Sequence, residues 1–373
     1  MAEQMDQSTA QQLFEEGGTF VFLDVPSGTE FGIDYNSWQV GTKFKGVKMI
    51  PPGVHFVYYS AVNSTGQTAP RTGFFHNFQQ KEVYVRKWNS RLEDIDPDPI
   101  SAEEQQRIED NKKDMDRFLG AYPYDSYKKW VSLTNFITGP LMEKLQPANQ
   151  RISSVTELVS EPSTSQSRAA NKTPASPRSE VTSLKQAESQ LPDMAAMPGS
   201  SCNFSAVPKQ AYPDGANASE ITKYNMDQSY KLENLLNTHY KDNPLGLLGE
   251  IQFTFICFLV GQVYDGFEQW KVLVSLLCSC EEAIAKYTEL YTQFISMMHY
   301  HVKEIPEDFF VDIVSSDNFL TTTLHSFFVN LAESNADGQL KSKGLRFKKH
   351  LEKKFNWDFT SEPDEYAPVI VDC

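Results

Sequence analysis

The chain has 373 residues, of which 40% are hydrophobic and 12% aromatic, enough for two folded domains and too many for a chain that is disordered throughout. Its formal net charge of −15 excludes nonspecific binding to nucleic acid or to an anionic membrane over most of the surface, because an acidic chain repels phosphate. The five cysteines lack the spacing of a disulfide framework, which favours a reducing, intracellular compartment.

Residues 1–150 are predicted to form a β-rich domain, an antiparallel sandwich or barrel with flanking helices. Short runs of β-branched and aromatic residues, bounded by turn signals, predict four of its strands, at residues 19–25, 54–59, 73–78 and 83–88. Ser101 and Glu104 form a capping-box pattern, so a helix is expected to begin there. Another helix is expected after Asp125, ending at Gly139 and Pro140.

Residues 151–210 have the composition of a disordered linker. They contain 13 Ser and 6 Pro, and Leu, Ile, Val and Phe together make up only 15% of the segment, too little to bury a core. We therefore expect a flexible tether that sets the effective concentration of one folded domain beside the other. Thr173 and Ser176 precede prolines and are candidate phosphorylation sites, whose phosphates are hypothesised to dock on basic residues of the last helix.

Residues 211–356 are predicted to form an all-α domain, either a bundle or a short superhelical stack. Apolar spacing, with proline and glycine stops, predicts helices at residues 219–238, 245–278, 281–302, 307–315, 318–333 and 340–355. The longest of these is expected to break near Gly261 or Gly266, because glycine is a poor helix former.

The most apolar stretch, residues 245–264, is about as long as a membrane span, but it begins a stripe of polar or small residues at helical spacing. The stripe consists of Glu250, Thr254, Cys257, Gly261, Asp265 and Glu268. We expect it to be the solvent-exposed edge of a core helix, and the protein to be soluble. A hydrolase in which Glu250 and Asp265 are buried acids is an alternative.

The sequence contains no phosphate-binding loop, dinucleotide-binding glycine motif, nucleophile elbow or zinc-protease motif. His299 and His301 are two residues apart, which on a helix points their rings in different directions, so a shared metal is not expected. The same argument applies to Cys278 and Cys280, interpreted as small buried side chains. His55 is interpreted as a buried, hydrogen-bonded histidine, with a lone general base as the alternative. We expect a protein that is not an enzyme and has no cofactor and no metal.

The last predicted helix carries a cluster of basic residues with one acid among them. The basic residues are Lys341, Lys343, Arg346, Lys348, Lys349, Lys353 and Lys354. They form a candidate docking patch for an acidic or RNA-bearing partner. The alternative is a solvated helix face, in which lysines near the C-terminus also suit the helix macrodipole.

Residues 357–373 are predicted to form an extended C-terminal tail, because Pro363 follows the last helix and a β-branched triplet lies near the end. Pro368, Val369, Ile370 and Val371 are the candidate partner-binding residues. One interpretation is that residues 367–372 add a strand to the edge of a partner's sheet, where backbone hydrogen bonds supply affinity. The alternative is a tail without fixed structure.

Seven runs of the sequence resemble the AAR-two (AAR2) family of splicing factors, named after a-one/alpha-two repression. They are GIDYNSW (32–38), FKGVKMIPPGVHF (44–56), RFLGAYPY (117–124), KKWVSLTNFI (128–137), GEIQFTFICFLVGQVYDGFEQWK (249–271), EIPEDFFVDIVSSDNFLTTTL (304–324) and KKFNWDF (353–359). The resemblance covers both predicted domains and leaves out the linker. It implies an N-terminal β-rich domain and a C-terminal helical domain similar to VHS superhelices.

The resemblance further implies a non-enzymatic assembly factor, or chaperone, of the U-five (U5) small nuclear ribonucleoprotein in pre-mRNA splicing. Such proteins bind the spliceosomal core protein Prp-eight (Prp8) through its RNase H-like and Jab/MPN-like domains, and delay helicase binding until the particle matures. In the family the tail adds a strand between those two domains, which here corresponds to residues 367–372.

The resemblance also implies that the protein is found in the cytoplasm and nucleus and is monomeric by itself. It implies no membrane binding and no main dependence on direct RNA binding. The alternative function is a trafficking adaptor, because VHS-like domains also bind sorting peptides and membranes. Against the adaptor, a domain with an acidic excess would approach anionic lipid at a cost.

Overall fold

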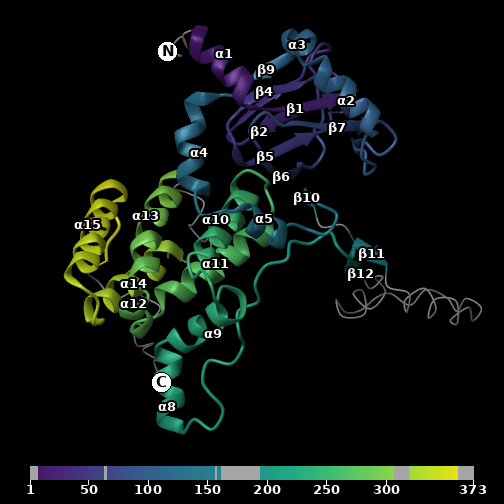
Figure 1. Ribbon diagram of the computed structural model, residues 1–373. Coiled ribbons are helices and arrows are strands. Elements are labelled where there is room, and N and C mark those ends of the chain that lie inside the picture. Colours follow the sequence, from purple (N-terminus) through teal and green to yellow (C-terminus); the bar gives the residue numbers. More distant parts are fainter. Residues whose placement is uncertain (1–6, 63–64, 156–157, 161–193, 306–318, 360–373) are drawn as a thin grey trace, which may run out of the picture.

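The computed structural model describes residues 7–62, 65–155, 158–160, 194–305 and 319–359 (Figure 1). An N-terminal β-rich part lies above a C-terminal helical part, and α4 and α5 connect the two (Figure 1). The predicted fold class, a β-rich domain followed by a helical domain, is confirmed.

The β-rich part is a sandwich of two five-stranded sheets. One has the order β8-β7-β1-β4-β9 and the other the order β10-β6-β5-β2-β3. The strands are β1 (Gly18–Leu23), β2 (Glu30–Ile33), β3 (Asn36–Gln39), β4 (Gly46–Ile50), β5 (Gly53–Ser60), β6 (Thr72–Phe78), β7 (Val83–Asn89), β8 (Asp94–Ile95), β9 (Leu119–Ala121) and β10 (Ile152–Ser153).

The expectation of purely antiparallel sheets is wrong for the first sheet. Strand β7 pairs with β1 in parallel, and β9 pairs with β4 in parallel. The reason is topological: between β1 and β7 the chain crosses twice to the second sheet, and it returns running in the original direction. The second sheet is antiparallel throughout.

Aromatic side chains fill the space between the two sheets. Phe20 and Phe22 of β1 and Phe31 of β2 are fully buried, and the rings of Phe20 and Phe31 stack with centroids 5.9 Å apart. Alternate residues of a strand point to the same face, so both phenylalanines of β1 reach this core. The helices of the part are α1 (Gln7–Glu16), α2 (Ala102–Asp110), α3 (Lys112–Met115), α4 (Tyr127–Thr134) and α5 (Gly139–Leu145).

The predicted start of α2 is confirmed, since Ser101 is its N-cap and its hydroxyl accepts a hydrogen bond from the Glu104 backbone N–H at 3.2 Å. Asp125, by contrast, does not cap α4; the residue in the N-cap position is Ser126, which makes no side-chain capping bond. The helix α5 begins at Gly139, so Gly139 and Pro140 start a helix instead of ending one. Proline is favoured in the first turn, where its missing N–H has no intrahelical partner to lose.

The helical part consists of α8 (Ala218–Met226), α9 (Ser229–His239), α10 (Gly246–Leu259), α11 (Tyr264–Cys278), α12 (Glu282–Lys286), α13 (Thr288–Glu304), α14 (Phe319–Glu333) and α15 (Gly338–Phe355). The break near Gly261 is confirmed, because α10 ends at Leu259. The predicted helix 219–238 is divided at Asp227, whose carboxylate accepts from the backbone N–H groups of Ser229 and Glu281 and so joins the starts of α9 and α12. The predicted helix 307–315 lies outside the described residues.

The two parts share one hydrophobic core. Phe56 and Phe75 of the second sheet pack in the same cluster as α10 and α11, and the Phe75 ring stacks on Phe253 of α10 at 4.4 Å between centroids. Arg71 on the sheet side donates at 2.8 Å to the Val260 carbonyl. The domains are therefore fixed against each other by packing, which corrects the expectation that a tether sets their proximity.

The ends of the predicted linker are folded. Ile152 is buried and pairs with Gly73 of β6, while Asn203 donates to the Gln146 carbonyl at 2.7 Å and Ser205 is buried against α10. Residues 158–160 (β11) and 194–196 (β12) form a two-stranded ladder. The boundaries 151 and 210 were therefore too wide, because local composition does not report contacts with distant elements. Residues 156–157 and 161–193 lie outside the described part.

Candidate functional site

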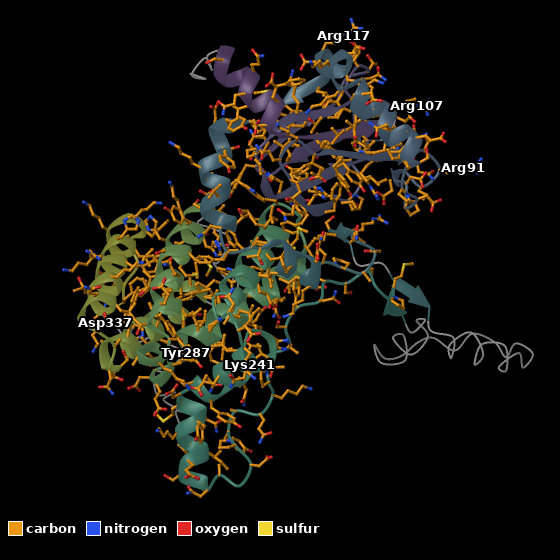
Figure 2. The ribbon with its side chains drawn as sticks, viewed as in Figure 1. Arg91, Arg107, Arg117, Lys241, Tyr287 and Asp337 are labelled. Carbon is orange, nitrogen blue, oxygen red and sulfur yellow. The ribbon has the colours of Figure 1, made fainter. Side chains whose placement is uncertain are left out.

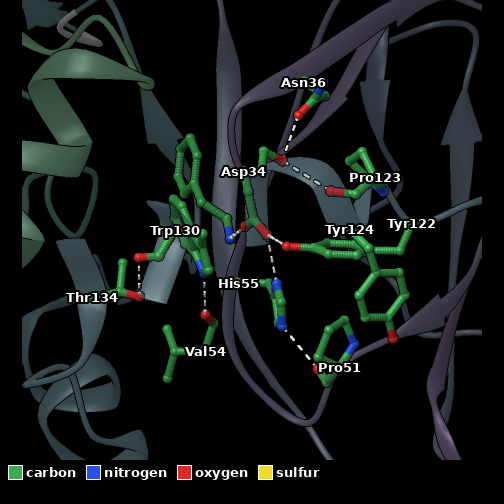
Figure 3. Close-up of polar contacts among 12 residues, drawn as sticks. Asp34, Asn36, Pro51, Val54, His55, Tyr122, Pro123, Tyr124, Trp130 and Thr134 are labelled. Atoms are coloured by element: carbon green, nitrogen blue, oxygen red, sulfur yellow. Dashed lines mark hydrogen bonds and ion pairs between the residues drawn. The ribbon is translucent and has the colours of Figure 1, made fainter. Parts of the chain in front are cut away.

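A buried polar network surrounds His55 on β5 (Figure 3). Asp34 occupies the left-handed region, with φ of 53°, in the two-residue turn between β2 and β3. Its carboxylate accepts from His55 Nδ1 at 2.7 Å, the Phe56 backbone N–H at 3.0 Å and the Tyr122 hydroxyl at 2.6 Å. The other ring nitrogen of His55 lies 2.8 Å from the Pro51 carbonyl oxygen. The two ring nitrogens of His55 therefore contact a carboxylate on one side and a backbone carbonyl on the other.

This network is structural. His55 is 1% exposed and Asp34 is 0% exposed, so neither group meets solvent or a substrate. Burial, followed by the nearby Asp34 charge, raises the pKa of Tyr122, which keeps that hydroxyl a donor. The contacts tie the β2–β3 turn to β5 and to the segment after β9. The interpretation of His55 as a buried, satisfied histidine is confirmed, and nothing in its surroundings supports a general base.

Glu250 is also fully buried, which corrects the expectation of a solvent-exposed stripe. Its carboxylate accepts from the Ser205 backbone N–H at 2.7 Å, from the Tyr240 hydroxyl and from Gln269 Nε2 at 3.3 Å. Asp265, by contrast, is exposed. The two acids therefore do not form a catalytic pair, because only one is buried and its oxygens are occupied by structural donors.

The rest of the stripe divides in the same way. Thr254, Cys257 and Gly261 are buried, whereas Glu268 is half-buried and lies 2.7 Å from Lys271. Ser205 meets Glu250, and Gly266 of α11 lies against Thr254 and Cys257, contacts that helical spacing alone does not predict. Among the described residues, no helix is both long enough and apolar enough to span a membrane.

His299 and His301, and likewise Cys278 and Cys280, are two residues apart in the sequence and form no shared site among the described residues. Cys278 and Cys280 are both buried, and burial raises the pKa of each thiol. His301 is buried and accepts a hydrogen bond from Trp270 Nε1 at 3.1 Å, whereas His299 is half-buried on another side of α13. Within the described ranges, no three His, Cys, Asp or Glu side chains gather as metal ligands would.

The seven basic residues of the last helix all lie on α15, but they do not form one surface. Lys341, Lys343 and Lys348 are half-buried and bonded to backbone oxygens of neighbouring segments. The other four are exposed: Arg346, Lys349, Lys353 and Lys354. The sequence did not distinguish these groups, because the distinction depends on which sides of α15 face α13 and α14.

Two sets of predicted site residues lie outside the described residues: the tail positions Pro368, Val369, Ile370 and Val371, and the phosphorylation sites Thr173 and Ser176. The chain is described as far as Phe359, which is buried with its ring 5.1 Å from that of Phe328 on α14. The last described residue, Phe359, therefore lies beside α14.

Sequence reasoning missed two surface recesses. One, of about 650 Å³, lies between the two sheets beside β6 and β7 and includes Phe74, Tyr84 and Arg86. The other, of about 910 Å³, is a groove among α8, α11 and α14 with Met226, Val272 and Val329 exposed on it. Exposed apolar residues are single positions in the sequence, and only the fold brings them onto one surface.

Comparison with known proteins places the same two parts in one family. A family model described as the AAR2 N-terminal domain matches residues 16–147, and one described as the AAR2 C-terminal repeat region matches residues 204–360. Proteins named "Protein AAR2 homolog" are 47% identical in Mus musculus, over 99% of this chain, and 46% identical in Homo sapiens, over 100% of it. The homolog of that name from Caenorhabditis elegans is 38% identical over 94% of the chain. Each alignment covers 97% of the relative's own length.

Proposed function

Because the chain belongs to the AAR2 family, we propose that it is a non-enzymatic assembly factor, or chaperone, of the U5 small nuclear ribonucleoprotein in pre-mRNA splicing. In this proposal it binds the core protein Prp8 through the RNase H-like and Jab/MPN-like domains and delays helicase binding until the particle matures. The observation that carries the proposal is the family similarity over both folded parts and nearly the full chain.

The geometry supports a role as a rigid binding platform. Since the two parts share a core across Phe75 and Phe253, surfaces on each part stand at a fixed separation. Binding a two-domain partner then has a low entropy cost, because the two parts are already fixed relative to each other. Two surfaces on one rigid body suit a partner that presents an RNase H-like and a Jab/MPN-like domain together.

The tail is proposed to add a strand to the partner. Pro368 fits the start of an edge strand, and Val369 and Val371 would face one side while Ile370 faces the other. The test is the affinity of the full chain for a purified Prp8 fragment that contains both domains, measured by calorimetry. Ile370→Pro removes a backbone donor as well as a side chain, so it is expected to weaken binding more than Ile370→Ala.

Both variants are expected to melt at the temperature of the unchanged protein, which serves as the control for folding. Equal affinity of Ile370→Pro and the unchanged protein would refute strand addition and leave the globular surfaces as the interface. Absence of any binding to the Prp8 fragment would refute the proposed function. Salt-sensitive flotation with acidic liposomes would favour the trafficking adaptor instead.

In this proposal the protein works in the cytoplasm and nucleus, is monomeric before it meets its partner, and does not depend mainly on direct RNA binding. Light scattering of the purified chain tests the monomer, and imaging of a tagged chain tests the location. A stable dimer would contradict the proposed monomer, and confinement of the tagged chain to one compartment would contradict the proposed location.

A further inference from the structure

Three of the basic residues of α15 serve packing and are not free to bind a partner. Lys343 donates at 2.7 Å to a carbonyl oxygen of α13, and Lys341 donates at 2.9 Å to one of α14. Lys348 donates at 3.1 Å to a carbonyl in the segment after α15 and lies 4.0 Å from Glu352. These lysines fix α15 against its neighbours.

Of the remaining basic residues, Arg346, Lys353 and Lys354 form a surface with residues of α13, because α13 and α15 run parallel and in register. Lys343 meets the middle of α13, and one to two turns further on the rings of His299 and His350 lie 4.7 Å apart between centroids. Lys303 and Lys354 follow one turn later on the two helices. The surface, called here the basic patch, consists of His299, Lys303, Arg346, His350, Lys353 and Lys354.

The basic patch has no acidic counterpart in the part of the chain that the structure describes. Glu304, the one acid in the last turn of α13, is ion-paired with Lys129 of α4 and accepts from the Tyr35 hydroxyl at 3.2 Å. No carboxylate lies within ion-pair distance of Lys303 or Lys354 among the described residues. The basic patch is a local basic surface on a chain with 49 acidic residues and a formal net charge of −15, and a negatively charged ligand complements it.

The electrostatics of His299 show the same repulsion. Burial lowers its pKa, and the neighbouring His350, Lys354 and Lys303 lower it further. The parallel C-termini of α13 and α15 place two negative helix ends near the cations, which explains how the free protein tolerates the patch. An anion bound there would relieve the repulsion and favour protonated histidine.

We propose that the basic patch binds a phosphorylated serine or threonine in an acidic segment of a partner protein. A phosphate carries about two negative charges and three acceptor oxygens, so it matches several donors that converge from two helices. From Arg346 to Lys354 the patch extends about 12 Å along α15, room for one phosphate and its flanking residues but not for a length of nucleic-acid backbone. This proposal does not depend on the proposed splicing function.

The source is taken to be another protein instead of the linker of this chain. The ladder of β11 and β12, from which residues 161–193 leave, lies on the opposite side of the molecule from α15 (Figure 1). The described ends of the linker, in β11 and β12, therefore lie far from the basic patch (Figure 1), which favours a partner protein as the source of the phosphate.

Binding is expected to tighten as the pH falls from 8 to 7, a range in which the phosphate keeps most of its second negative charge. His299, whose ring lies 4.7 Å from that of His350, is expected to take up a proton when the anion binds, because the negative charge opposes the repulsion that lowers its pKa. Linkage allows at most about a tenfold gain in affinity per pH unit for each proton taken up. A purely structural cluster of lysines would show no such dependence.

The test is fluorescence anisotropy of the full chain with a labelled 12-residue acidic peptide that contains one phosphothreonine. The Lys303→Ala/Lys354→Ala double variant is expected to bind at least about tenfold more weakly, since two charge-assisted contacts are lost. Lys241→Ala is the matched control: Lys241 is an exposed lysine at the end of α9, away from α15 (Figure 2), and its loss should leave affinity unchanged. The unphosphorylated peptide should also bind at least about tenfold more weakly.

Four outcomes would overturn the proposal. One is equal affinity for the phosphorylated and unphosphorylated peptides, and another is equal affinity of the double variant and the Lys241→Ala control. The third is tighter binding of a 12-residue oligouridine than of the phosphopeptide at the same salt concentration, which would assign the basic patch to RNA. If prior phosphorylation of Thr173 and Ser176 blocks the peptide, the linker is the occupant and the assignment to a partner is wrong.

Discussion

Replacing Phe253 by alanine should destabilise both parts of the molecule at once. Phe253 is fully buried on α10, and its ring stacks on Phe75 of β6 at 4.4 Å and lies 6.4 Å from Phe204. Removing a buried phenylalanine side chain typically costs about 3–5 kcal/mol, because transfer free energy is lost and a cavity remains. For a chain of 373 residues, an unfolding entropy of about 2.1 cal/mol/K per residue converts this into a fall in Tm of roughly 5 °C.

Calorimetry combined with hydrogen exchange can follow the two parts separately. We expect one cooperative transition in the unchanged protein and in Phe253→Ala, with faster exchange in β6 as well as in α10 of the variant. Val272→Ala is the matched control, since Val272 lies on α11 but is 45% exposed, so its loss should shift Tm little. Two separate melting transitions, of which only that of the helical part shifts in Phe253→Ala, would refute the shared core. They would support the alternative of two independent domains joined by a flexible tether.

Three further predictions concern the linker, a buried acid and pH. Replacing residues 161–193 by an Asn-Gly turn should keep one cooperative melting transition, because the flanking residues Ser160 and Met194 are already paired in the β11–β12 ladder; an unfolded variant would contradict this. Glu250→Ala should cost about 3 kcal/mol in urea unfolding, since it leaves buried donors unpaired, and Glu250→Gln should cost less. Burial lowers the pKa of His301 to about 3, whereas a histidine in the unfolded chain titrates near 6.5. Below pH 6.5 the unfolded state therefore binds more protons than the folded state, and the free energy of unfolding should fall by up to about 1.4 kcal/mol per pH unit. An equal slope in His301→Gln would show that other groups are responsible.

Much of this protein is encoded by local pattern. Four strands, β1, β5, β6 and β7, and the helices of the helical part follow from hydrophobic period. The start of α2 follows from Ser101, because a helix cap is a contact between residues three apart. The break after α10 follows from Gly261, whose absent side chain allows a turn there. Family resemblance also belongs to this level, since it depends on runs of adjacent residues. For these features the controlling contacts lie within a few positions along the chain.

The tertiary structure decided the features whose partners are distant in sequence. Glu250 appeared to lie on a solvent-exposed edge, but Ser205, 45 residues earlier, returns across α10 and buries it. The basic residues of α15 cannot be told apart by sequence, but in the structure some donate hydrogen bonds to α13 and α14 and others are exposed. Helical periodicity defines a polar face, but it carries no information about which segment covers that face. Only the packing of the whole chain supplies that cover, because a buried polar group is stable only where a donor or acceptor from elsewhere meets it.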